Sequence, residues 1–172
     1  MRGRAWMTCL VIMCAIAGAD VAPAQQATAG CSSAQGPNAT KTLRCRDGLI
    51  VVAEDGAKFT LQGKGGNVDG VDLQSKALLL DAPKQKGNTR FQVITPQAIA
   101  AVRGTKWAVD AQASRTSVLV LNGQVAVRRA SGAGEVVLGA GEGVDVEPGT
   151  DALVVKRWPQ PRVDALLARL GQ

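Results

Sequence analysis

The sequence predicts an all-β fold, a jelly-roll-like β-sandwich of short antiparallel strands that ends in one short helix. Short β-prone runs alternate with Gly, Pro, Asp-Gly and Asn-Gly turn signals along most of the chain. Near the end, Val163, Leu166, Leu167 and Leu170 follow helical spacing instead. The 172 residues are enough for one such domain.

The first 24 residues have the pattern of a secretory signal peptide. Arg2 and Arg4 give a basic start, an apolar run follows over residues 6–17, and small residues precede Ala24. We expect cleavage between Ala24 and Gln25 and a periplasmic or secreted location. The apolar run is shorter than the ~20 residues that a membrane span needs, which disfavours a retained anchor.

Two cysteines would remain after cleavage, Cys31 and Cys45. An even pair in an exported protein predicts a disulfide. Closing this loop is worth about 3 kcal/mol and would tie a polar leader, residues 25–48, to the first strand. A lipid on Cys31 is disfavoured because the polar Gln25-Gln26 pair separates that cysteine from the apolar run.

The first part of the body, which spans residues 49–158, predicts a hairpin over residues 49–61. Asp55-Gly56 is a two-residue turn signal, and such a turn would place Val52 opposite Phe59. A glycine-rich connector is expected over 63–70. A strand over 76–80 and a basic turn over 84–88 should follow.

The second part contains the clearest hairpin signal, Asn122-Gly123 within residues 117–128. Strands are also expected over 91–94 and 98–102, and Gly104 should mark a bulge or a close backbone approach. Beyond a turn at 130–134, short strands are expected over 136–138 and 144–146, and a last one over 153–158. Thr105, Trp107 and Val109 should share one strand face, with Trp107 in the core.

Residues 159–172 predict a short amphipathic helix. We expect it to cap an open end of the sheets, with Trp158 clamping it in place. Docking to a partner is the alternative role.

The stretches TPQAIAAVRGTKWAVD, SVLVLNGQVAVR and EVVLGAGEGVDV, which lie within residues 95–146, resemble the FecR domain of the bacterial cell envelope. The shared positions are Thr95, Pro96, Val102, Arg103, Gly104, Thr105, Trp107, Asn122, Gly123, Gly139, Gly141 and Gly143. The resemblance implies two stacked sheets of jelly-roll type and signalling through contacts with other proteins. Full-length sigma-regulating relatives add a cytoplasmic segment and a membrane span, so this chain resembles a stand-alone exported form.

The residue content argues against most catalytic chemistry. The chain has no histidine and no tyrosine, which excludes histidine-dependent triads and imidazole acid–base catalysis. The remaining carboxylate clusters, Asp69/Asp72 and Glu142/Asp145/Glu147, are interpreted as solvated turns and strand faces. One imperfect glycine-aspartate copy over 65–72 is a weak calcium signal. No cofactor, metal site or catalytic residue is predicted.

The basic residues do not indicate a nucleic-acid partner. Pairs such as Arg128-Arg129 and Lys156-Arg157 lack the interleaved aromatics that stack on bases. They are interpreted as solvated strand ends that discourage edge-to-edge aggregation.

Together these patterns predict a noncatalytic periplasmic protein-interaction module of FecR type, in envelope signalling or assembly. An envelope protein is the expected partner, and binding of peptidoglycan or another envelope glycan is the alternative. Neither nucleic acid nor, after cleavage, a membrane span is expected. The candidate interaction residues are Arg103, Gly104, Thr105, Trp107, Asn122 and Gly123. Arg103 would either pair with Asp110 or offer its planar fork to a partner carboxylate.

We expect the mature protein recovered from cells to begin at Gln25, because the small residues before it are those that signal peptidase selects. N-terminal sequencing and intact-mass measurement check this. A protein that still begins at Met1, or a mass that includes lipid on Cys31, would contradict the assignment.

Overall fold

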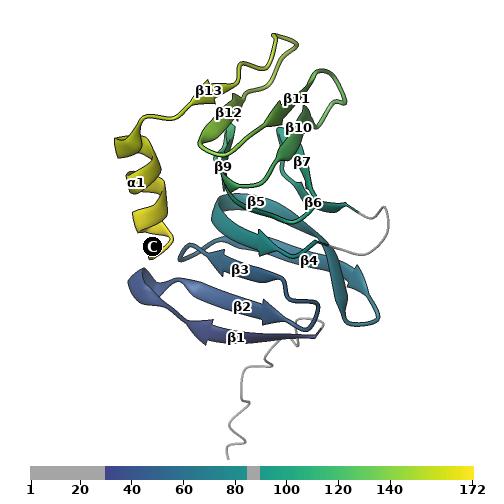
Figure 1. Cartoon of the computed structure of the whole chain (residues 1–172), viewed down its shortest axis with the longest axis vertical. Helices are drawn as coiled ribbons and strands as arrows, with labels where there is room; N and C mark the ends of the chain where they lie inside the picture. Colours follow the sequence, from purple (N-terminus) through teal and green to yellow (C-terminus); the bar gives the residue numbers. More distant parts are fainter. Residues whose placement is uncertain (1–29, 85–89) are drawn as a thin grey trace, which may run out of the picture.

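The computed structural model describes residues 30–84 and 90–172, and this part of the chain is built almost entirely from β-strands (Figure 1). The elements in chain order are β1 (Cys31–Gln35), η1 (Pro37–Ala39), β2 (Lys41–Cys45), β3 (Ile50–Ala53), β4 (Lys58–Lys64), β5 (Asn67–Ala82), β6 (Phe91–Ile94), β7 (Ala98–Val102), β8 (Thr105–Ala111), β9 (Thr116–Asn122), β10 (Val125–Arg129), β11 (Glu135–Leu138), β12 (Glu142–Val146), β13 (Lys156–Arg157) and α1 (Gln160–Arg169). The all-β class and the C-terminal helix are confirmed.

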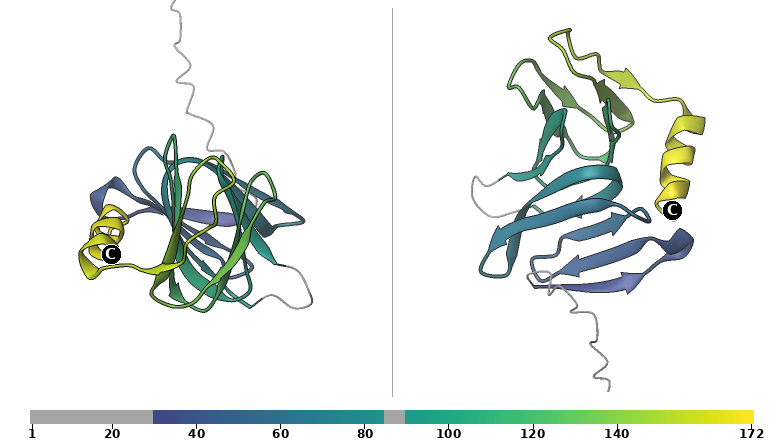
Figure 2. Two further views of the ribbon diagram at one scale, coloured as in Figure 1. Left: turned by 90° about the horizontal axis from the view of Figure 1, so that it is seen from above. Right: turned by 180° about the vertical axis from the view of Figure 1, so that it is seen from behind.

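The described strands form one curled hydrogen-bonded sheet. Its main path runs β11-β10-β7-β6-β5-β8-β9-β12-β13, with β4 paired to β5 and with β3, β2 and β1 continuing from β5 on the other side. The views in Figure 2 show the curl, with α1 lying outside it. The predicted jelly-roll arrangement of two separate sheets is a finer description that this pairing does not confirm.

β5 joins the two halves of the curl because it changes partners along its length. Its first half pairs antiparallel with β4 and parallel with β6. From Lys76 onward it pairs antiparallel with β3 and β8. Lys76 has a φ of 70°, which side chains rarely adopt, and the β4 register shifts just before it. This irregularity bends the strand and turns one ribbon into two facing halves.

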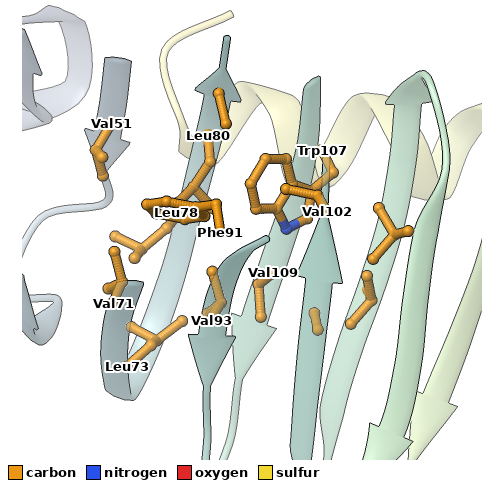
Figure 3. Close-up of a cluster of buried hydrophobic side chains, with 14 of the residues drawn as sticks. Val51, Val71, Leu73, Leu78, Leu80, Phe91, Val93, Val102, Trp107 and Val109 are labelled. Carbon is orange, nitrogen blue, oxygen red and sulfur yellow. The ribbon is translucent and has the colours of Figure 1, made fainter. Parts of the chain in front are cut away.

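The main core lies between these halves. Val71 and Val93 come from one half and Leu78, Leu80 and Val109 from the other, and all five are fully buried in one cluster (Figure 3). Trp107 lies at its centre with no exposed surface and meets Phe91 edge-to-face, with 5.8 Å between ring centroids. The prediction that Trp107 fills the core is confirmed, and its ring makes no surface for a partner.

The predicted hairpin at Asp55-Gly56 is wrong. The chain does turn there, since Ala57 N–H donates to Glu54 O over 3.0 Å. β3 and β4, however, do not pair with each other, because both pair with β5, on its second and first halves. The Asp55-Gly56 signal therefore predicted the turn correctly, but the pairing of β3 with β4 incorrectly.

The predicted hairpin at Asn122-Gly123 is wrong for the same reason. β9 pairs with β8 and β12, whereas β10 pairs with β7 and β11. The segment between them crosses from one half of the curl to the other. Only Gly123 has a positive φ, 90°, whereas the expected turn would require one at Asn122 as well.

The N-terminal leader and the glycine-rich connector are also more ordered than predicted. Residues 30–48 contribute β1 and β2, which extend the sheet beyond β3. Cys31 and Cys45 lie directly opposite each other in this pair and form the predicted disulfide. In place of a connector over 63–70, Gly65-Gly66 turns β4 into β5.

The remaining local predictions have mixed outcomes. The strands over 91–94, 98–102, 136–138 and 144–146 and the turn at 130–134 are present. In the expected strand over 153–158 only β13 forms. The cleavage site at Ala24 and Gln25 lies outside the described residues, as does most of the basic turn at 84–88.

Replacing Gly143 by alanine should lower the free energy of unfolding by about 1–3 kcal/mol. A Cβ at this position in β12 would meet Val118 O at 2.7 Å and the Trp158 indole nitrogen closer still, so backbone and ring would have to move apart. Gly139→Ala is the matched control, because its Cβ would meet only the end of the Glu142 side chain at 3.4 Å. Denaturant titrations measure both, and equal effects would contradict the close-contact explanation.

Candidate interaction surface

α1 covers the outer face of one half of the curl. This half consists of β8, β9 and the part of β5 from Lys76 onward. Leu166 and Leu170 pack with Ala77, Leu79, Ala108, Leu119 and Trp158 in a second, smaller apolar cluster. Because this helix covers one face and the main core the other, β8 and β9 are buried on both sides along most of their length. The helix therefore lies across a sheet face, and not over an open end as the sequence suggested.

Arg169, in the last turn of α1, is the first of two ionic clasps between helix and sheet. Its guanidinium bonds Asp110 over 2.8 Å and Glu54 over 2.6 Å. Asp110 is only 5% exposed, so its charge needs this partner. The hydrogen bonds that Arg169 donates to Asp110 and Glu54 raise its pKa further above the ordinary value. The predicted pairing of Arg103 with Asp110 is therefore wrong.

Arg162, near the start of α1, makes the second clasp. Its guanidinium lies 3.5 Å from the centre of the Trp158 ring and bonds Asp145 of β12 over 2.5 Å. Ser117 donates a further bond to Asp145 over 2.6 Å. Burial raises the pKa of the Asp145 carboxyl, but the bonds from Arg162 and Ser117 and the charges of Arg162 and Arg115 outweigh it, so that pKa lies below its ordinary value.

Three of the five carboxylates in the clusters considered for catalysis make such structural contacts, whereas Asp69 and Glu147 are exposed. Asp145 anchors the helix, Glu142 accepts the Gly139 N–H over 2.7 Å, and the Asp72 carboxylate accepts a bond from the Gln74 amide. Within residues 30–84 and 90–172, no three metal-ligating side chains gather in one place. In the same part of the chain, no helix is both long and apolar enough to traverse a bilayer.

The outer face of the other half, formed by β6, β7, β10 and β11, has no such cover. Along β7 and β10 every second residue is buried and the residues between are partly accessible, as expected of a sheet with the core on one side. The register aligns Gln92, Ala101, Ala126 and Val137 across the four strands. Val137 is 56% exposed, which makes it one of the two most exposed large apolar side chains among the described residues.

A shallow groove of about 460 Å³ runs over this face. Ala101, Ala126 and Val137 line its middle, and Gln124 lies beside them. Arg90 and Arg103 line one end, and Glu135 of the edge strand lines the other, where it lies opposite Arg128 of β10. The groove therefore has a small apolar floor, two arginines at one end and a single carboxylate, with Arg128 opposite it in the register, at the other.

The two arginines follow directly from the strand register. Phe91 pairs with Val102, so Arg90 and Arg103 are the next neighbours on β6 and β7, at the same end of both strands. Both are exposed. No ion pair or side-chain hydrogen bond joins either to another residue of the described chain.

The sequence-predicted site residues divide into one surface residue and a structural group. Arg103 reaches the groove, whereas Trp107 lies in the core. Gly104, with a φ of 71°, closes the bend from β7 to β8. Thr105 Oγ1 donates to Gln124 O over 3.0 Å. A Cβ on Gly123 would lie only 3.0 Å from Gly104 O. Gly104, Thr105 and Gly123 thus hold the segment that crosses from β9 to β10.

Asn122 does not line the groove. It lines a separate surface pocket together with Lys84 and Lys106. Sequence reasoning missed Arg90, Ala126 and Val137, because only the strand order brings them beside Arg103. It also misjudged Arg129, which is buried and donates to the carbonyl oxygens of Glu147 and Asp151.

Comparisons with known proteins agree with this architecture. A family model described as FecR protein matches residues 34–126, more than half of the chain. Two crystal structures of a "putative anti-sigma factor" from Parabacteroides distasonis ATCC 8503 align with a TM-score of 0.61 at 20% sequence identity. The alignments cover 80% and 79% of this chain but only 64% of the crystallised one. At this level of identity they show a shared fold. No curated protein sequence matches the chain.

Asp145 should make the stability of the helix clasp depend on pH. A carboxyl whose pKa is lowered by folding contributes stability above its unfolded pKa of about 3.9, and that contribution is lost as pH falls through the folded pKa. Asp145 is about one-third exposed, so the effect should be about 1 kcal/mol or less. Urea titrations should show Asp145→Asn less stable than the unmodified protein at about pH 6, with the gap narrowing towards about pH 3. Parallel curves would contradict the clasp.

Proposed function

Because the chain belongs to the FecR family, we propose that it is a noncatalytic protein-interaction module in bacterial envelope signalling that binds its partner through the open face of β6, β7, β10 and β11. We further propose that it works in the periplasm. The predicted signal peptide supports this location, and so does the Cys31–Cys45 disulfide, since such bonds persist in oxidising compartments.

The main support for the proposal is that one outer face of the sheet is covered by a helix and the other is not. The chain covers the β8–β9 face with α1 and fixes the helix with Arg162 and Arg169. On the opposite face it leaves a groove, an exposed valine and two arginines without a partner among the described residues. Exposed apolar surface with a polar rim is typical of a protein-binding site.

The contacts of four carboxylates support a role without catalysis. Glu54, Asp110 and Asp145 serve the two clasps, and Glu142 caps the turn before β12. A general acid or base needs a titratable group that is free to reach a substrate, and these groups are already engaged. No comparable observation favours the glycan-binding alternative.

Site-specific photocrosslinking in cells that produce the protein tests this proposal. A benzoylphenylalanine at Val137 in the groove should capture a specific protein, because that side chain points out of the open face. The same label at Val154, which is 57% exposed but lies on another surface, is the matched control and should capture it far less. If neither label captures a protein, or both capture it equally, binding through this face is contradicted. If the protein is instead retained on peptidoglycan, the glycan alternative is favoured.

A further inference from the structure

We infer that the groove recognises an extended segment of a partner protein that presents a carboxylate to Arg90 and Arg103 and a small apolar side chain to Ala101, Ala126 and Val137. This inference rests on the proposed function and specifies the chemistry of the partner. It is carried by the shape of the groove floor and by the placement of charge around it.

The floor allows a polypeptide to approach the sheet closely. Ala101 and Ala126 are cross-strand neighbours in the middle of the face, and Val137 follows on the edge strand. Methyl groups on two adjacent strands leave room for a main chain to lie close to the sheet surface, whereas longer side chains would keep it away. Apolar side chains of the partner can then lose water against this floor and against Val137.

The charges determine which segment fits. Arg90 and Arg103 stand side by side at one end, and like charges in neighbouring positions of a sheet repel each other. A carboxylate placed between them would remove this repulsion and accept hydrogen bonds from both planar guanidinium groups. At the other end Glu135 lies opposite Arg128, so positive charge is in excess only at the arginine end, and the acidic group of the segment should lie there.

The same charges argue against the two occupants that the chain itself could supply. The N-terminal segment outside the described residues has two arginines and one aspartate, so its charge has the same sign as the arginine end. A second copy of the protein, with a net charge of +6, would meet like charge as well. A separate, acidic partner segment is the occupant that matches.

Selection from a phage-displayed library of random dodecapeptides on the purified protein tests the inference. Selected peptides should carry Asp or Glu next to small apolar residues, and their affinity, measured by fluorescence anisotropy, should fall as ionic strength rises. Arg103→Glu and Arg90→Glu should each weaken binding about fivefold to tenfold, whereas Glu135→Lys should strengthen it. Ala126→Phe should abolish binding although it adds apolar surface.

Arg44→Glu is the matched control, because it makes the same charge change at an exposed position on β2 and should alter affinity little. Unchanged thermal unfolding and circular dichroism establish that each variant is folded. No selected peptide, a basic consensus, or equal losses with Arg44→Glu and Arg103→Glu would overturn the inference. If crosslinking at Val137 still captures a protein in that event, the proposed function stands and only the acidic recognition fails.

Discussion

The double pairing of β5 is the constraint on which the rest of the structure depends. One strand, Asn67–Ala82, holds β4 and β6 with its first half and β3 and β8 with its second. The backbone at Lys76 takes up the bend between these halves. Because both halves of the curl hydrogen-bond to this strand, their inner faces are placed opposite each other and enclose one core around Trp107.

The same curl gives the molecule two outer faces with different roles. On one, Leu166 and Leu170 of α1 bury the apolar residues of β5, β8 and β9. The two clasps place opposite charges on helix and sheet, and partly buried pairs of this kind fix orientation more than they add stability. On the other face no helix covers the sheet, and Arg90 and Arg103 have no partner among the described residues. The helix thus covers one outer face and leaves uncovered the face that we propose for binding.

Sequence patterns predicted the strands and turns better than the pairing between them. The alternation of residues 98–102 and the helical spacing near the C-terminus both hold, because each reflects local geometry and burial. Asp55-Gly56 and Asn122-Gly123 looked like hairpin turns, but neither joins paired strands, since strand partners are chosen by contacts distant in sequence. Residues 118–120 are apolar on both faces, which fits a central strand under a helix as well as the hairpin first inferred. Arg103 was found from its motif, whereas Arg90 and Val137 join it only through the strand order.

The position of β5 also orders the assembly of the chain as it emerges into the compartment where it folds. β1 and β2 pair locally, so they can form a hairpin early, closed by the cysteines at its open end. β3 can pair with β2 before β5 is present, whereas β4 pairs only with β5. β5 is complete only when Ala82 has emerged. Until that residue has emerged, the edges that later become central strands lack their partners, and such edges are prone to pair with other chains. The first half of the protein therefore passes through a stage in which shielding by a chaperone would matter most.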